Sequence, residues 1–177
     1  MRTQFNLTLL TAAVLLAVAT GCGKVVDSPP TAKASASIDG AQFKLSDEPD
    51  GAVGVIAARE EAENGAPLVL VGRVGGTAKP WVEGRAAFTL LDASMSIVAE
   101  GEDSGEAEVC MGDCCATERM SCTTLVKVVD EQGKIVPVDS RELLGLKESD
   151  MVVVTGTAKK DQSGNFTMLA NGVYVRN

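Results

Sequence analysis

The fold of this chain is decided by one short stretch, Asp139-Ser140-Arg141-Glu142-Leu143-Leu144-Gly145-Leu146. It predicts a brief helix, because Asp139 is a good N-cap residue and Glu142, three residues later, is the reciprocal member of a capping box. Segments with strand-like patterns lie on both sides of this helix. Its position among them indicates which β architecture the chain adopts.

Five segments are predicted as the principal strands. Three precede the helix, at residues 68–74, 86–91 and 123–129, and two follow it, at residues 151–158 and 166–170. Within 123–129, Thr124, Val126 and Val128 share one face and Lys127 lies on the other. This alternation is typical of a sheet with one solvent-exposed face. Residues 134–138 are predicted as a short partner after a glycine turn, and residues 173–175 as a closing strand.

Three strands, a short helix and two strands is the order of the OB-fold, a small five-stranded barrel. The predicted fold class is therefore mainly β, an OB-fold-like barrel with its helix between the third and fourth strands. Gly72 and Gly156 lie inside predicted strands, as small barrels require where a strand bends sharply. A generic β-sandwich is the alternative, and the single capped helix favours the barrel.

Four stretches resemble a group of secreted OB-fold lipoproteins common in planctomycete bacteria: Leu70–Gly76, Gly84–Asp92, Leu143–Leu146 and Val152–Gly156. The resemblance covers most of residues 47–177 and implies a fold and a cell-envelope location, because no activity is established for the group. Its members tend to carry a Cys-Cys pair after the second strand, matched here by Cys114-Cys115 with Cys110 upstream. The aromatic residues expected beside that pair are missing, and Cys122 is additional.

The first 21 residues have the pattern of a secretory signal, with Arg2 before an apolar run from Leu7 to Ala19. That run is shorter than the roughly 20 apolar residues that span a bilayer. Ala19-Thr20-Gly21-Cys22 resembles a lipobox, so Cys22 is predicted to become the acylated first residue of the mature chain, anchored by palmitate-type acyl chains. An ordinary signal peptide with an incidental cysteine is the alternative. Gly23, in place of Asp, favours the outer membrane, with the domain facing the periplasm.

Four segments are predicted along the chain. They are a signal peptide at 1–21, a flexible tether with the lipidated cysteine at 22–46, a helical lead-in at 47–66 and a barrel domain at 67–177. The tether is rich in Ser, Ala, Pro, Lys and Thr. In the lead-in, Val53, Ile56 and Ala57 fall at helical spacing and Asn64-Gly65 is a plausible C-cap.

Charge and composition exclude several functions. The chain has 16 basic and 24 acidic residues, a net charge of −8, and no histidine. An acidic surface repels phosphate backbones, so no nucleic-acid partner is expected. Without histidine there is no Ser-His or Cys-His dyad. The chain is therefore predicted to be no enzyme, with the membrane and an unidentified envelope protein or small ligand as partners.

Cys110, Cys114, Cys115 and Cys122 lie in a long predicted loop, residues 93–122. Two disulfides are the first interpretation, because this polar loop of an exported protein cannot bury a core of its own. Adjacent cysteines pair with each other only through a strained ring, so Cys114 and Cys115 are expected to pair with Cys110 or Cys122. A thiolate site for zinc or copper, with Asp113 or Glu118 in reserve, and a thiol-redox protein are the alternatives. Free thiols are a further alternative. No cofactor is expected under the first interpretation.

Trp81 is the candidate for an exposed aromatic contact. It follows Lys79-Pro80 between the first two predicted strands. A tryptophan folded over the barrel mouth as a plug is the alternative. The predicted function is a lipid-anchored envelope module that binds or has a structural role, with the cysteine loop as its clasp.

Overall fold

The computed structural model describes residues 38–98, 108–110 and 116–176 of the 177-residue chain. The predicted signal peptide, the lipidation site Cys22, the tether as far as residue 37, and the Cys114-Cys115 pair lie outside these residues. The last part of the predicted tether is described, and it packs on the barrel. There a 3-10 helix, η1 (Gly40–Phe43), places Phe43 in the core with 6% of its surface exposed.

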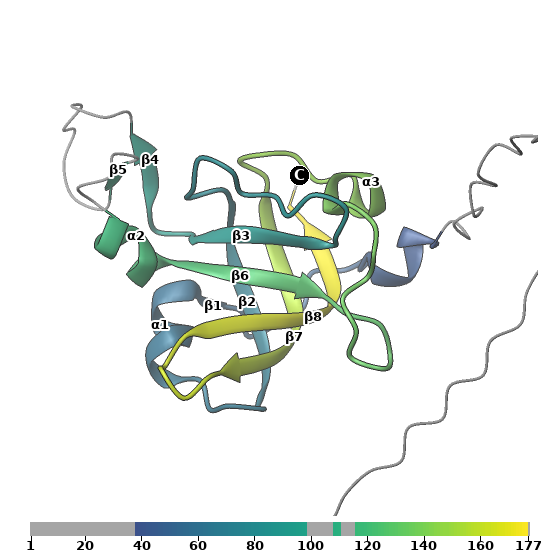
Figure 1. The fold of residues 1–177 in the computed structure, drawn as a ribbon, viewed down its shortest axis with the longest axis horizontal. Coiled ribbons are helices and arrows are strands. Elements are labelled where there is room, and N and C mark those ends of the chain that lie inside the picture. Colours follow the sequence, from purple (N-terminus) through teal and green to yellow (C-terminus); the bar gives the residue numbers. More distant parts are fainter. Residues whose placement is uncertain (1–37, 99–107, 111–115, 177) are drawn as a thin grey trace, which may run out of the picture. The chain divides into compact units, whose positions relative to one another are not determined.

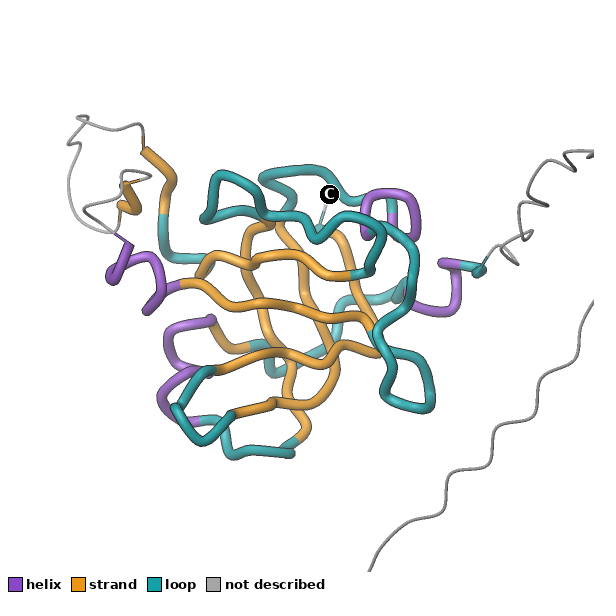
Figure 2. Tube along the Cα trace, viewed as in Figure 1, coloured by secondary structure: helices purple, strands orange, loops and turns teal. Residues whose placement is uncertain are grey.

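Five strands close into an OB-fold-like barrel (Figures 1 and 2). They are β2 (Pro67–Val74), β3 (Ala87–Asp92), β6 (Thr123–Val128), β7 (Met151–Lys160) and β8 (Phe166–Val175). The order around the wall is β2-β3-β6-β8-β7, and β7 pairs again with β2 to close it. Neighbouring strands are antiparallel except β6 and β8, which are parallel. The predicted fold class is confirmed.

Helix α3 (Ser140–Leu144) lies between the third and fourth barrel strands, as predicted. The Asp139 carboxylate caps it by accepting from the amide of Arg141 at 2.9 Å, and Gly145 ends it in the left-handed conformation at φ 73°. The predicted capping box differs in detail, because Asp139 bonds the amide of Arg141 and not that of Glu142. Leu143 and Leu144 are buried and fix the helix against the barrel end.

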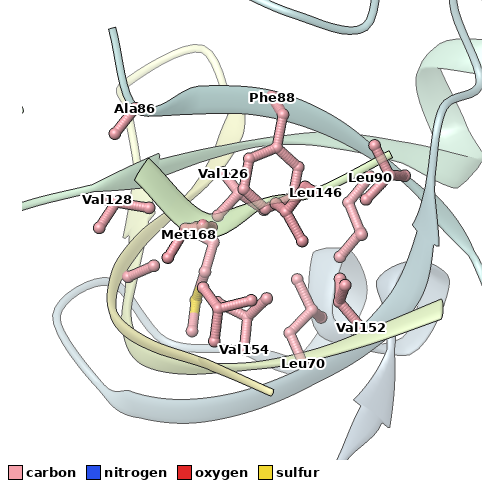
Figure 3. Close-up of a cluster of buried hydrophobic side chains, with 14 of the residues drawn as sticks. Leu70, Ala86, Phe88, Leu90, Val126, Val128, Leu146, Val152, Val154 and Met168 are labelled. Carbon is pink, nitrogen blue, oxygen red and sulfur yellow. The ribbon is translucent and has the colours of Figure 1, made fainter. Parts of the chain in front are cut away.

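The barrel interior is filled by side chains from every strand of the wall (Figure 3). Inward-facing positions alternate with outward-facing ones, so Thr124, Val126 and Val128 are buried while Lys127 is half-buried, as the sequence pattern predicts. The fully buried residues include Leu70, Phe88, Leu90, Val126, Val152, Val154 and Met168. These side chains occupy the barrel interior.

Two glycines permit close approach of neighbouring strands. A Cβ on Gly156 would lie 2.0 Å from the carbonyl oxygen of Leu169, and one on Gly72 would lie 2.5 Å from that of Leu91. The β7–β8 register shifts between Thr155 and Gly156, which marks a β-bulge. Both glycines therefore act as the sequence predicts, at points where the barrel wall tightens.

The helical lead-in is shifted relative to its prediction. Val53 and Gly54 form a short strand, β1 (Val53–Gly54), parallel to β2, and helix α1 (Val55–Glu61) begins only after them. The helix ends at Ala62 in an extended conformation, so Asn64-Gly65 is not its C-cap. It buries Val55 and Ala58 and leaves Ile56 36% exposed. Pairing of β1 with β2 sets this register, which helical spacing alone does not show.

Two further predicted strands differ from the structure. Residues 134–138 form no strand, and only an isolated bridge joins Val129 to Ile135. Residues 173–175 are not a separate strand, because β8 runs unbroken from Phe166 to Val175. Asn171 has no partner in β7, and this β-bulge lets β8 bend with the barrel wall as one strand, without a turn at Asn171 and Gly172.

Candidate functional site

The segment between β3 and β6, residues 93–122, projects from one end of these two strands (Figure 1). It contains strands β4 (Ser96–Val98) and β5 (Glu108–Cys110), which pair in parallel, and helix α2 (Ala116–Cys122). We call it the cysteine excursion. The sequence predicts a long loop here, whereas the structure shows a turn at Ala93 and Ser94 followed by β4.

Asp92 holds the first end of the cysteine excursion. Its side chain is nearly buried, with 5% of the residue exposed, and it accepts from the amides of Ile56 and Ser94, each at 2.9 Å, and from the Ser94 hydroxyl at 2.6 Å. Burial raises the pKa of Asp92, but these hydrogen bonds together lower the pKa by more than burial raises it. The pKa therefore lies below its ordinary value. One carboxylate thus joins the start of α1 to the start of the excursion.

Cys122 holds the second end. It is 3% exposed and packs with Leu91 and Met95 in a small apolar cluster outside the barrel. Its thiol donates to the carbonyl oxygens of Glu118 and Arg119, both at 3.4 Å. Burial raises the pKa of the Cys122 thiol, and the Asp92 charge adds to the effect, so the group is a poor thiolate here.

The chain beside Cys122 is fixed to α1 and to α2. Arg59 of α1 donates to the carbonyl oxygen of Thr123 at 3.1 Å, and the Thr123 hydroxyl donates to that of Arg119 at 2.6 Å. Both ends of the cysteine excursion are therefore tied to the same face of the barrel.

The structure brings only part of the cysteine cluster into view. Cys110 ends β5, which contacts α2, so the strand of Cys110 and the helix of Cys122 are neighbours. Among the described residues, none forms a disulfide with Cys122. Within residues 38–98, 108–110 and 116–176, no group of three or more Cys, Asp or Glu side chains is arranged to hold a metal ion.

Trp81 lies at the opposite end of β3, partly exposed and packed against the barrel core. It bridges to Phe88, whose ring centre is 6.3 Å from that of Trp81. The Arg141 guanidinium lies over the indole, with Cζ 5.5 Å from the ring centre. Trp81 therefore contributes to packing while keeping part of its surface in contact with solvent.

Arg141 is held in place by Asp139. Two guanidinium nitrogens, Nε and Nη2, donate to the two carboxylate oxygens at 2.8 and 2.7 Å. These bonds, with the amides of Arg141 and Gly84, lower the pKa of Asp139 to about 2. The ion pair lies within the start of α3, and the Gly84 amide beside Asp139 joins it to the β2–β3 connection.

An open groove of about 500 Å³ lies beside this pair. It is lined by Ala78, Lys79, Pro80, Trp81, Glu83, Arg141 and Glu148. Of these, the sequence singles out Trp81 with its neighbours Lys79 and Pro80 and misses the others. The Asp139-x-Arg141 spacing at a helix start is the one local signal that indicates a fixed arginine.

No protein-family model matches the chain, and no curated protein matches it. None of the described helices is long and apolar enough to cross a membrane.

Proposed function

We propose that this chain is a lipid-anchored module of the cell envelope that binds a partner or has a structural role, and that it is no enzyme. The attachment of the cysteine excursion to the barrel carries the proposal, because Asp92 and Cys122 fix its two ends beside α1. The filled barrel supplies a rigid support, and the excursion and the outer grooves supply the contact surfaces. The membrane, and an envelope protein or small ligand, are the proposed partners, with no nucleic acid among them.

Lipid anchoring at Cys22 is tested by substitution. Cys22→Ser is expected to abolish incorporation of labelled fatty acid and to release the chain from the membrane fraction, because serine cannot form the thioether. Cys115→Ser is the matched control and should keep both the label and the membrane location. Labelling that persists in Cys22→Ser would contradict lipid anchoring at Cys22.

The clasp is tested by intact mass. We expect two disulfides among Cys110, Cys114, Cys115 and Cys122, because cross-linking this long excursion stabilises the fold by roughly 2 to 4 kcal/mol. In Cys122, pairing replaces two weak thiol hydrogen bonds by a covalent link. The exported chain should gain the mass of four hydrogens on reduction and resist alkylation before it, without bound metal.

A different mass result has a defined meaning. Four alkylatable thiols with stoichiometric zinc or copper would replace the clasp by a metal-binding function of the same cysteines. A single disulfide that exchanges readily with a dithiol would indicate a thiol-redox protein instead. Either result contradicts the clasp and leaves the anchor at Cys22 to its own test.

A further inference from the structure

We propose that the groove between the β2–β3 loop and α3 binds a neutral saccharide. Trp81 and Arg141 form its platform, and Lys79, Glu83 and Glu148 form its rim. The inference rests on the proposed function, because it names the ligand class that the envelope module binds. Neither the core nor the cysteine excursion uses these rim residues.

The platform is preorganised. The β2–β3 hairpin continues past β2, since Pro80 accepts from the Thr89 amide at 2.7 Å and the Val82 amide donates to Ala87 at 3.0 Å. Trp81 therefore stands on paired backbone rather than on a free loop. Asp139 fixes the Arg141 guanidinium by two hydrogen bonds over the indole. A ligand that stacks here meets groups that need little ordering on binding.

The groove carries charges of both signs. Its lining residues include two cations, Lys79 and Arg141, and two carboxylates, Glu83 and Glu148, and the Asp139 carboxylate is paired with Arg141. A polyanion meets the carboxylates and the overall net charge of −8, and a polycation meets the two basic groups. A neutral ligand escapes both repulsions. The groove therefore selects by hydrogen bonds and shape rather than by net charge.

Saccharide chemistry matches this mixture. Each hydroxyl both donates and accepts, so one ring can use ammonium or guanidinium donors and carboxylate acceptors together. The C–H face of a sugar ring is apolar and packs on an aromatic side chain, and the aromatic side chain in the lining of this groove is Trp81, which is partly exposed and has Arg141 over its ring. The volume of about 500 Å³ falls in the usual range for small-molecule sites, and the open side admits a chain of sugar units.

Trp81 makes the test specific, because it is the one tryptophan of the chain. The full chain, purified in a detergent without a sugar headgroup, is titrated with tetra-N-acetylchitotetraose, cellotetraose and maltotetraose while tryptophan fluorescence is followed. A heparin tetrasaccharide serves as the anionic comparison. At least one neutral tetrasaccharide should give a saturable change with a Kd of about 1 mM or tighter. The heparin fragment should give none in that range.

Substitutions at the rim keep the reporter and test the geometry. Glu83→Gln and Glu148→Gln should each weaken neutral-saccharide binding about 10-fold, because a charged acceptor is lost while size is kept. Glu142→Gln is the matched control, since Glu142 is exposed on α3, the helix of Arg141, and does not line the groove. It should leave the Kd unchanged.

Three results would overturn the site. They are a flat titration with all three neutral sugars up to about 10 mM, tighter binding of the heparin fragment, or equal weakening by Glu142→Gln and Glu83→Gln. Any of these leaves the anchor and the clasp standing, because acylation and intact mass measure them separately. Fatty-acid labelling that persists in Cys22→Ser instead contradicts the proposed function and leaves the saccharide titration valid.

Discussion

Gly156→Ala is expected to lower the free energy of unfolding by about 3 kcal/mol or more. A Cβ at this position would lie 2.0 Å from the carbonyl oxygen and 2.8 Å from the carbonyl carbon of Leu169, both of them backbone atoms. They cannot move aside singly, because β7 and β8 are paired from Val152 to Lys160 on both sides of the bulge. Urea denaturation of the full chain, followed by circular dichroism, measures the loss.

Gly133→Ala is the matched control for this substitution. Gly133 has a φ of 74° and no heavy atom within 4 Å of its would-be Cβ. An alanine at this position makes no close contact, and adopting the left-handed backbone conformation costs it about 1 kcal/mol. Equal losses in the two variants would contradict close strand approach as the reason for Gly156.

The barrel could be predicted because its strands carry their own patterns. Alternation in 123–129 marks the buried face of β6, and Asp139 marks the start of α3, although the helix ends at Leu144 and not at Leu146 as predicted. Errors arise where distant contacts decide. The register of α1 depends on pairing between β1 and β2, and β8 continues as one strand through a bulge at Asn171. Neither the β1–β2 pairing nor the bulge is visible as a local sequence pattern.

Helix α2 was missed for a related reason. The cysteines, acidic residues and glycines of 99–122 resemble an irregular loop, and Thr117, Glu118 and Met120 on the helix are exposed, so no apolar period marks it. Its contacts are made at its end, where Cys122 packs against Leu91. Hydrophobic periodicity cannot reveal a helix in which Cys122 is the one described side chain that is buried.

The candidate sites divide in the same way. The cysteine cluster is visible as spacing, and Trp81 stands out as a lone aromatic between strands. The groove beside Trp81 is not visible, because its lining comes from residues 78–83, from α3 and from Glu148. Sequence separation of about 60 residues hides such a meeting, and the topology of the barrel creates it.

Asp92→Ala is expected to lower the free energy of unfolding by about 3 kcal/mol, because two amides and a hydroxyl lose a charged, nearly buried acceptor. The effect should be largest at α1 and at the start of the cysteine excursion. Hydrogen exchange should therefore show faster exchange at Ile56 and in the turns of α1 that follow. Asp50→Asn, at an exposed carboxylate, is the control and should stay within about 0.5 kcal/mol of the unchanged chain.

The hydrogen bonds to the Asp92 carboxylate also make the free energy of unfolding depend on pH, in a direction that the pKa shift decides. The pKa of Asp92 is lower in the folded chain than in the unfolded one, so the ionised carboxylate stabilises the fold above the unfolded value of about 4. This contribution falls as the pH drops below that value and is lost as the pH passes through the lowered folded pKa. The difference in unfolding free energy between the unchanged chain and Asp92→Asn should accordingly be largest near neutral pH and shrink below about pH 4. A difference that stays constant from pH 7 to about pH 2 would show that shape, and not charge, is what Asp92 contributes.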